Sequence, residues 1–153
     1  MWITPTIATL QAHLSGPEYE ALRSAARAAG QSADSLTTDS LARSVATVRG
    51  YVGARHTLGL EGTIPDELES ALGCIWRYEY ITRLPNSDRL LDDRRLRAWE
   101  NAIATLKDVS AGRFAIVPPT SPAEDAMQAG GPGFEQVVPS RRANDTTALD
   151  GLL

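Results

Sequence analysis

Few residues of this 153-residue sequence could carry out chemistry, and they lie far apart. Cys74 is the only cysteine, and it lies among apolar residues, where we expect a buried and unreactive thiol. His13 and His56 have no regular spacing to each other or to a carboxylate, so they indicate neither an acid/base pair nor a metal site. We therefore expect a protein that is not an enzyme and that needs no metal or cofactor.

Two other patterns lack a part that their chemistry would require. Glu67 and Glu69 are two positions apart in a predicted helix, so we expect their side chains on different sides rather than as a paired-carboxylate site. The glycine-rich stretch at 130–133 is not followed by the Lys-Ser or Lys-Thr of a phosphate-binding loop. Neither pattern predicts a catalytic site.

Charge and hydropathy disfavour two further classes of protein. The net charge is −4, from 19 acidic and 15 basic side chains, and no cluster of Lys or Arg is long enough to indicate tight nucleic-acid binding. Arg94, Arg95 and Arg97 lie in a predicted helix, where we expect them to face solvent. No stretch approaches the ~20 apolar residues that span a bilayer, so no membrane partner is expected.

The elements that carry these residues are predicted to be helices, which makes the fold class all-α: a compact bundle of about five helices. Apolar residues recur at helical spacing and predict helices at about 5–14, 17–29, 38–53, 65–84 and 88–111. Gly30 and Gly112 are natural helix stops. The residues expected to begin the helices are Thr4 with Pro5, Ser15 with Pro17, Thr37 or Thr38, Thr63 with Pro65, and Ser87 with Asp88.

The predicted third and fourth helices differ in the width of their apolar surface. The third has a stripe typical of a core face, formed by Leu41, Val45, Val48 and Val52. The fourth is apolar over a broader surface, so we expect it to be covered on more than one side. This surplus favours contact with a neighbouring copy, although a monomeric bundle with a thick core explains the periodicity equally well. The broad surface consists of Leu68, Ala71, Leu72, Ile75, Trp76, Tyr78 and Ile81.

The chain is predicted to divide into a helical body at 1–117 and an extended C-terminal arm at 118–153. A short β-prone segment at 113–117 ends the body, and a second lies at 134–138 in the arm. The second segment could pair with the edge strand of a partner, or it could be an incidental feature of a disordered tail. The residues predicted to bind a partner are Phe134, Val137, Val138, Arg141 and Arg142.

Three stretches together give the sequence a family resemblance. They are 50–58, 65–80 with its Ile-Trp-Arg-Tyr run at 75–78, and 99–116 with its ending Leu-Lys-Asp-Val-Ser-Ala-Gly-Arg at 106–113. In this order and spacing they resemble the small head-to-tail connector, or neck adaptor, of Mu-like phages, over about residues 2–117. His56 departs from the pattern, because an aromatic residue such as tyrosine is expected at that position.

The resemblance implies a virion protein that assembles as a homo-oligomeric ring of twelve copies beneath the portal protein. The next neck or tail protein would bind the other side of the ring, and DNA would pass transiently through its lumen. Before assembly the protein would be in the host cytoplasm. A mildly acidic lumen would let DNA slide, with Asp92 and Asp93 or the acidic residues of the arm as candidates to line it. The residues expected at a subunit interface or in the core are Trp76, Tyr78, Tyr80 and Trp99.

Two alternative functions remain open. Another phage neck or tail protein, such as a tail terminator or a stopper, would meet the same broad physical demands. A small helical DNA-binding regulator would use residues 4–30 as its reader. That reading is weaker, because Arg23 and Arg27 are accompanied by Glu18 and Glu20, whereas a helix that enters a DNA groove needs several uncompensated cations.

Overall fold

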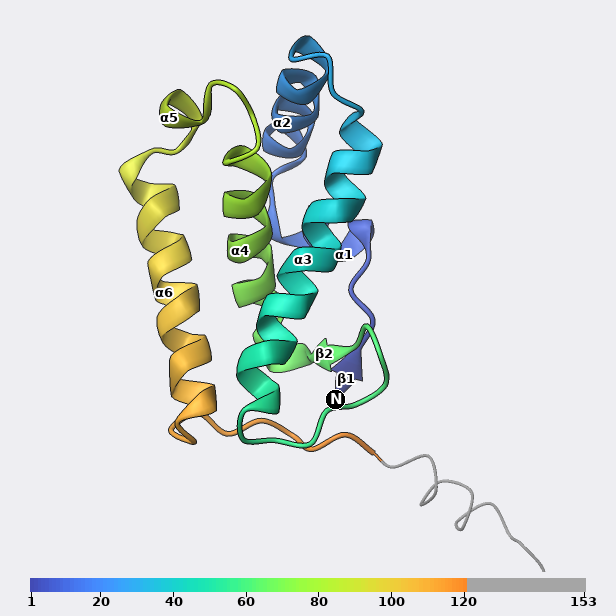
Figure 1. The fold of residues 1–153 in the computed structure, drawn as a ribbon, viewed down its shortest axis with the longest axis vertical. Coiled ribbons are helices and arrows are strands. Elements are labelled where there is room, and N and C mark those ends of the chain that lie inside the picture. Colours follow the sequence, from blue (N-terminus) through green and yellow to red (C-terminus); the bar gives the residue numbers. More distant parts are fainter. Residues whose placement is uncertain (121–153) are drawn as a thin grey trace, which may run out of the picture. The chain divides into compact units, whose positions relative to one another are not determined.

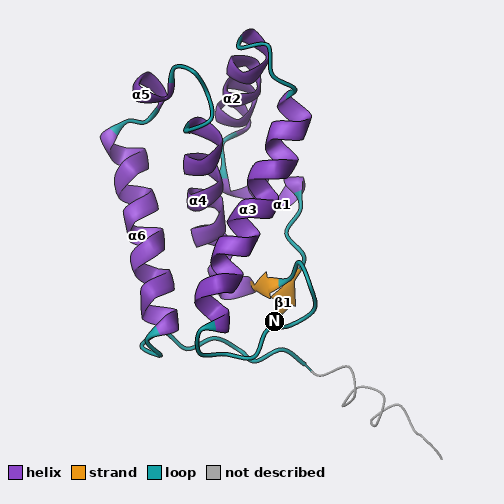
Figure 2. Ribbon diagram, viewed as in Figure 1, coloured by secondary structure: helices purple, strands orange, loops and turns teal. Residues whose placement is uncertain are grey.

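The structure is a computed structural model that describes residues 1–120, and within them it is a helical bundle with one small sheet (Figures 1 and 2). The prediction of an all-α fold is confirmed. The helices are α1 (Ile7–His13), α2 (Gly16–Ala28), α3 (Ala33–Gly53), the 3₁₀ helix η1 (Asp66–Leu68), α4 (Glu69–Ile81), α5 (Ser87–Leu90) and α6 (Asp93–Ser110). The strands are β1 (Trp2–Ile3) and β2 (Ile64–Pro65).

Helix α4 lies in the middle of the bundle, between α3 and α6 and against α1 (Figure 1). Its broad apolar surface is thereby covered on more than one side, as predicted. Leu72, Ile75, Trp76 and Ile81 are all buried within the single chain. The apolar surplus that favoured a neighbouring copy is therefore not found on this helix, because three other helices of the same body cover it.

The buried side chains form two clusters, one at each end of the bundle. The upper cluster, where α1 and α2 pack on the second half of α4, contains Leu10, Leu14, Tyr19, Leu22, Ala26, Ala33, Trp76, Tyr80, Ile81 and Leu84. The lower cluster, between α3, α6 and the first half of α4, contains Val45, Val48, Val52, Ile64, Leu68, Leu72, Ile75, Ala102, Leu106 and Val109. The predicted stripe of α3 thus supplies three valines to the lower cluster.

Several helices begin at residues other than those predicted. Helix α1 is capped by Thr6, whose hydroxyl accepts a hydrogen bond from the backbone N–H of Thr9, rather than by Thr4. Helix α3 begins after Ser32, five residues earlier than Thr37. Thr37 lies inside the helix, where its buried hydroxyl donates to the carbonyl oxygen of Ala33 at 2.7 Å. A threonine can be satisfied in this way within a helix, so its presence alone does not mark a helix start.

The predicted helix at 65–84 is shorter, because its first residues belong to a strand. Ile64 and Pro65 pair antiparallel with Ile3 and Trp2, and η1 follows before α4 begins. The predicted helix at 88–111 is divided into α5 and α6. Asp92 begins α6, since its carboxylate accepts the backbone N–H of Arg95 at 2.8 Å.

The β-prone segment at 113–117 does not form a strand. Its apolar side chains Phe114 and Ile116 pack instead against the lower cluster. The boundary between body and arm at 117–118 stays a prediction. The arm residues predicted to bind a partner, Phe134, Val137, Val138, Arg141 and Arg142, lie outside the described residues. No helix within residues 1–120 is long and apolar enough to cross a membrane.

Candidate functional site

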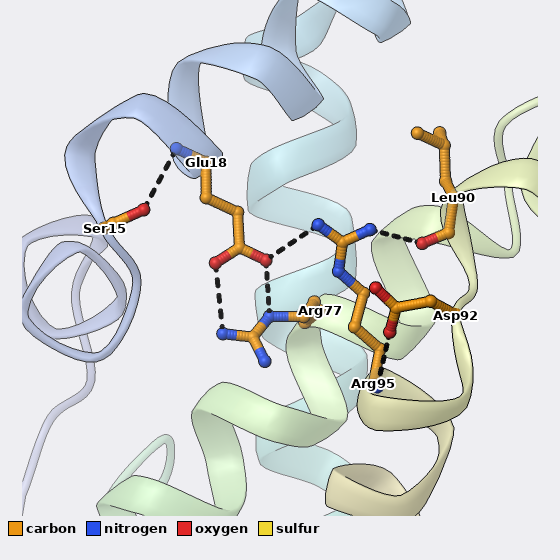
Figure 3. Close-up of polar contacts among 6 residues, drawn as sticks. All are labelled: Ser15, Glu18, Arg77, Leu90, Asp92 and Arg95. Carbon is orange, nitrogen blue, oxygen red and sulfur yellow. Dashed lines mark hydrogen bonds and ion pairs between the residues drawn. The ribbon is translucent and has the colours of Figure 1, made fainter.

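A polar cleft of about 560 Å³ lies between α2, α4 and the start of α6. Ser15 and Glu18 come from the start of α2, Arg77 from α4, and Arg95 from the first turn of α6 (Figure 3). Local sequence explains the ends of these elements. Ser15 caps α2 by accepting the backbone N–H of Glu18 at 3.3 Å, which holds Glu18 in the first turn of that helix.

The carboxylate of Glu18 joins two arginines from different helices (Figure 3). Its Oε1 atom lies 3.1 Å from Nε of Arg77 and 3.2 Å from Nη2 of Arg95. Arg95 also donates to the carbonyl oxygen of Leu90. The three charged side chains are each only about one-fifth to one-quarter exposed, at 21%, 18% and 25%. Screening by water is reduced at such burial, so this cluster ties α2 to α4 and α6 more firmly than an exposed ion pair would.

The sequence analysis did not predict this cluster of Glu18, Arg77 and Arg95. Arg95 was expected to face solvent, but its guanidinium is turned inward because α2 places a carboxylate there. Glu18 and Arg77 are 59 positions apart, so no local spacing could indicate the pair. Two guanidinium groups from different helices meet one carboxylate, an arrangement that crosslinks these helices.

The structure brings His13 next to a carboxylate that sequence spacing did not indicate. Its Nε2 atom lies 3.3 Å from Oε1 of Glu69, and both side chains are 32% exposed. Glu67 lies apart, where its carboxylate accepts the backbone N–H of Val117 at 3.2 Å. Glu67 and Glu69 therefore have different partners, Val117 and His13. Residues 1–120 contain no group of three or more His, Cys, Asp or Glu side chains that could hold a metal ion.

The lower end of the bundle carries a second group of polar contacts, and these hold the N-terminus and the segment after α6. The Met1 amine pairs with a carboxylate oxygen of Asp66 at 2.6 Å. The hydrogen bond from that pairing raises the pKa of the amine and lowers the pKa of Asp66. The indole N–H of Trp2 donates to the carbonyl oxygen of Val117 at 2.8 Å. The chain therefore leaves the body from a defined place beside β1 (Figure 1).

A protein-family model, described as Bacteriophage Mu, Gp36, matches residues 6–134 of this sequence. The chain belongs to the bacteriophage Mu Gp36 family. Membership identifies it as a protein of the Mu-like phage type and supports a role in phage structure or morphogenesis. No curated protein and no solved structure matches the chain. The match extends past Thr120 as far as Phe134, so it includes part of the predicted arm.

The four aromatic residues predicted for a subunit interface or the core of this Gp36 family member lie in two places. Trp76 and Tyr80 are fully buried in the upper cluster, with ring centroids 5.0 Å apart. Burial raises the pKa of the Tyr80 phenol. Tyr78 and Trp99 stack with centroids 4.4 Å apart between α4 and α6, and both remain half-buried. Only this second pair has surface that a partner could contact. Cys74 is half-buried rather than fully buried.

The large apolar side chains that the described body leaves exposed lie mainly at its lower end. Four of the five in residues 1–120 come from the N-terminus, the loop after α3 and the segment after α6. They are Met1, Leu58, Leu60 and Val117, which are 74%, 40%, 70% and 51% exposed. These four side chains are available for contact with another molecule.

Proposed function

We propose that this chain is a subunit of the head-to-tail connector of a Mu-like phage, a structural protein that forms a ring under the portal and joins capsid to tail. Its family membership over residues 6–134 is the single observation that carries this proposal. The role requires assembly and docking rather than catalysis. It is consistent with the partly buried ion pairs of the described body, because Glu18 joins three helices through Arg77 and Arg95.

A ring requires two different faces on each subunit, because every copy must contact its neighbours on both sides. The body offers apolar surface away from its own core in two regions. One is the exposed group at the lower end, which includes Leu60 and Val117. The other is the outer side of α3, where Ala42, Ala46 and Gly50 are exposed. These two surfaces support contact with further copies. They take the place of the surplus apolar surface that was expected on α4.

The proposed partners are the portal protein on one side of the ring and the next neck or tail protein on the other. The predicted arm would contact either a neighbouring copy in the ring or the portal. Its residues predicted to bind a partner are Phe134, Val137, Val138, Arg141 and Arg142. DNA would pass through the lumen without being held, which suits a net charge of −4. Asp92 and Asp93, both exposed at the start of α6, are candidates to face it.

Assembly and location are tested together. Purified full-length protein should form closed rings, seen by light scattering and negative-stain images, and phage lacking the protein should accumulate separate heads and tails. Electron cryomicroscopy of mature particles should show its density between portal and tail. Density at the tail end of the neck alone would instead indicate a terminator or stopper, and absence from the particle would contradict the proposal.

The DNA-binding regulator has no specific observation in its favour. In the proposed reader, Arg23 pairs with Asp34 at 2.5 Å and lies over the ring of Tyr19, so its charge is directed to the protein. Glu18, in the same helix, holds two further cations. Sequence-specific retardation of DNA by submicromolar protein at low salt would revive this function and count against the connector.

A further inference from the structure

The outer side of α3 carries an apolar trough that no part of the described body fills. It consists of two adjoining hollows of about 600 and 430 Å³, which share Ala46. Leu41 and Val45 line the first hollow, and Gly50 and Tyr51 line the second. Thr4, Pro5 and the loop at 61–62 form one wall of the first, so the trough lies beside the N-terminal segment.

Small residues at steps of four make up the floor of this trough. Ala42, Ala46 and Gly50 lie on one face of α3, Ala54 is the residue at its C-terminal cap, and all four are exposed. A Cβ added at Gly50 would meet nothing within 4 Å. The body therefore leaves room here for larger apolar side chains from elsewhere, over about 18 Å along the helix axis at 1.5 Å per residue.

We propose that the trough binds the apolar residues of segment 134–153 from a neighbouring copy of this chain. The inference rests on the proposed ring and adds to it the contact that would join adjacent subunits. The segment has the side chains that the trough lacks. They are Phe134, Val137, Val138, Leu149, Leu152 and Leu153.

The described residues end close enough to the trough for segment 134–153 to reach the trough of an adjacent copy. Val117 is held to Trp2 and Glu67, next to the N-terminal segment that forms a wall of the trough. From Thr120, the thirteen residues at 121–133 can span up to about 43 Å when extended, which is more than twice the length of the trough. The segment can therefore reach an adjacent body. Binding between copies, rather than within one, is what would close a ring.

Crosslinking between two differently marked copies tests the contact directly. In full-length protein carrying Cys74→Ala, we introduce Ala46→Cys in one preparation, and Phe134→Cys or Leu152→Cys in another. The preparations are mixed, allowed to assemble and treated with a short bifunctional maleimide. We expect a covalent dimer linking position 46 to 134 or 152, identified by mass spectrometry, because only a contact between copies can join cysteines that started in separate chains.

The matched control is Ala104→Cys, an exposed alanine of α6 that does not line the trough, which α6 reaches only at Ser110. It should give about tenfold less linked dimer, the ratio expected for a contact favoured by ~1.4 kcal/mol. Equal yields from the two positions would overturn the proposal. A link found only within one chain, when positions 46 and 134 or 152 are marked together, would also overturn it.

A second variant tests the contact without crosslinking. Ala46→Arg fills the trough with a charge and should weaken ring assembly at least about tenfold in concentration, whereas Ala104→Arg should not. Both positions are exposed, so neither variant threatens the fold. Rings unaffected by Ala46→Arg would overturn the trough contact and leave the connector intact. If the copies crosslink but the protein is absent from the phage neck, the contact between copies stands and the proposed connector function is overturned.

Discussion

The two ends of the bundle are held together by different kinds of contact. At the upper end, Trp76 meets the rings of Tyr19 and Tyr80, and the nearby Glu18 cluster adds charged contacts between α2, α4 and α6. At the lower end the core is aliphatic, and the polar contacts there hold chain segments such as the Met1 amine rather than helices. Aromatic and charged contacts thus join the helices of the upper end, while exposed apolar residues such as Leu60 and Val117 lie at the lower end.

Removing the Trp76 side chain should cause the largest loss of stability. The indole is fully buried between α2, α3 and α4, and its N–H donates to the carbonyl oxygen of Thr37 at 3.4 Å. We expect Trp76→Ala to lower the free energy of unfolding by about 3–5 kcal/mol, from lost burial and the cavity left behind. Urea denaturation followed by circular dichroism measures it. If Trp76→Ala lowered the free energy of unfolding by less than Leu106→Ala does, the proposed difference between the two ends would be contradicted.

At the lower end, Leu106→Ala should cost about 3 kcal/mol. Leu106 is fully buried where α6 meets α3 and α4, but its side chain is smaller than an indole and makes no hydrogen bond. The same urea denaturation applies, with the exposed Ala104→Ser on α6 as a control that should change stability by less than about 0.5 kcal/mol. A loss equal to that of the control would show that the lower cluster contributes little.

Glu18→Gln removes the charge that joins Arg77 and Arg95 while keeping the size of the side chain. We expect a loss of about 1–2 kcal/mol, because two partly buried guanidinium groups then face each other without a carboxylate. Glu20→Gln is the matched control, since Glu20 lies in the same helix and is exposed. Equal effects of the two substitutions on the urea midpoint would mean that the cluster does not stabilise the upper end.

The contact of the lower loop with the N-terminus is tested by Gly59→Ala. A Cβ at Gly59 would come within 2.7 Å of the Trp2 ring, so the indole must shift, at a cost of about 1 kcal/mol. Gly50→Ala, with open space around its Cβ, should stabilise α3 by about 0.5–1 kcal/mol instead. Trp2 is one of three tryptophans, so its shift is best followed by the indole N–H resonance in NMR. An unmoved Trp2 resonance would contradict this contact.

The smallest expected effect is the pH dependence of the Met1 and Asp66 pairing. The amine pKa is raised above 8.0, so its contribution is complete below pH 8.0 and is lost as the pH rises through the raised value. The Asp66 pKa is lowered below 3.8, so its contribution is complete above pH 3.8 and is lost as the pH falls through the lowered value. Asp66→Asn should remove both dependences from the Trp2 resonance. Identical titrations of the variant and the unaltered chain would contradict the pairing.

Local sequence determined most of the helices, because their signals lie within a few neighbouring residues. The Val45, Val48 and Val52 stripe predicted a core face of α3, and the Ser15 to Pro17 break predicted the start of α2. Gly30 and Gly112, at φ of 73° and 74°, end helices where a side chain would be strained. The breadth of the apolar surface on α4 correctly indicated cover on several sides.

Tertiary structure alone decided what covers that surface and which distant residues meet. Trp2 pairs with Pro65, and Glu18 meets Arg77 and Arg95, across separations that no periodic pattern records. The strand at β2 also displaced a predicted helix start, because pairing with β1 satisfies backbone groups that a helix would otherwise have used. Helical periodicity is a property of neighbours in the chain, whereas the partner of a charge or strand depends on how the whole chain packs.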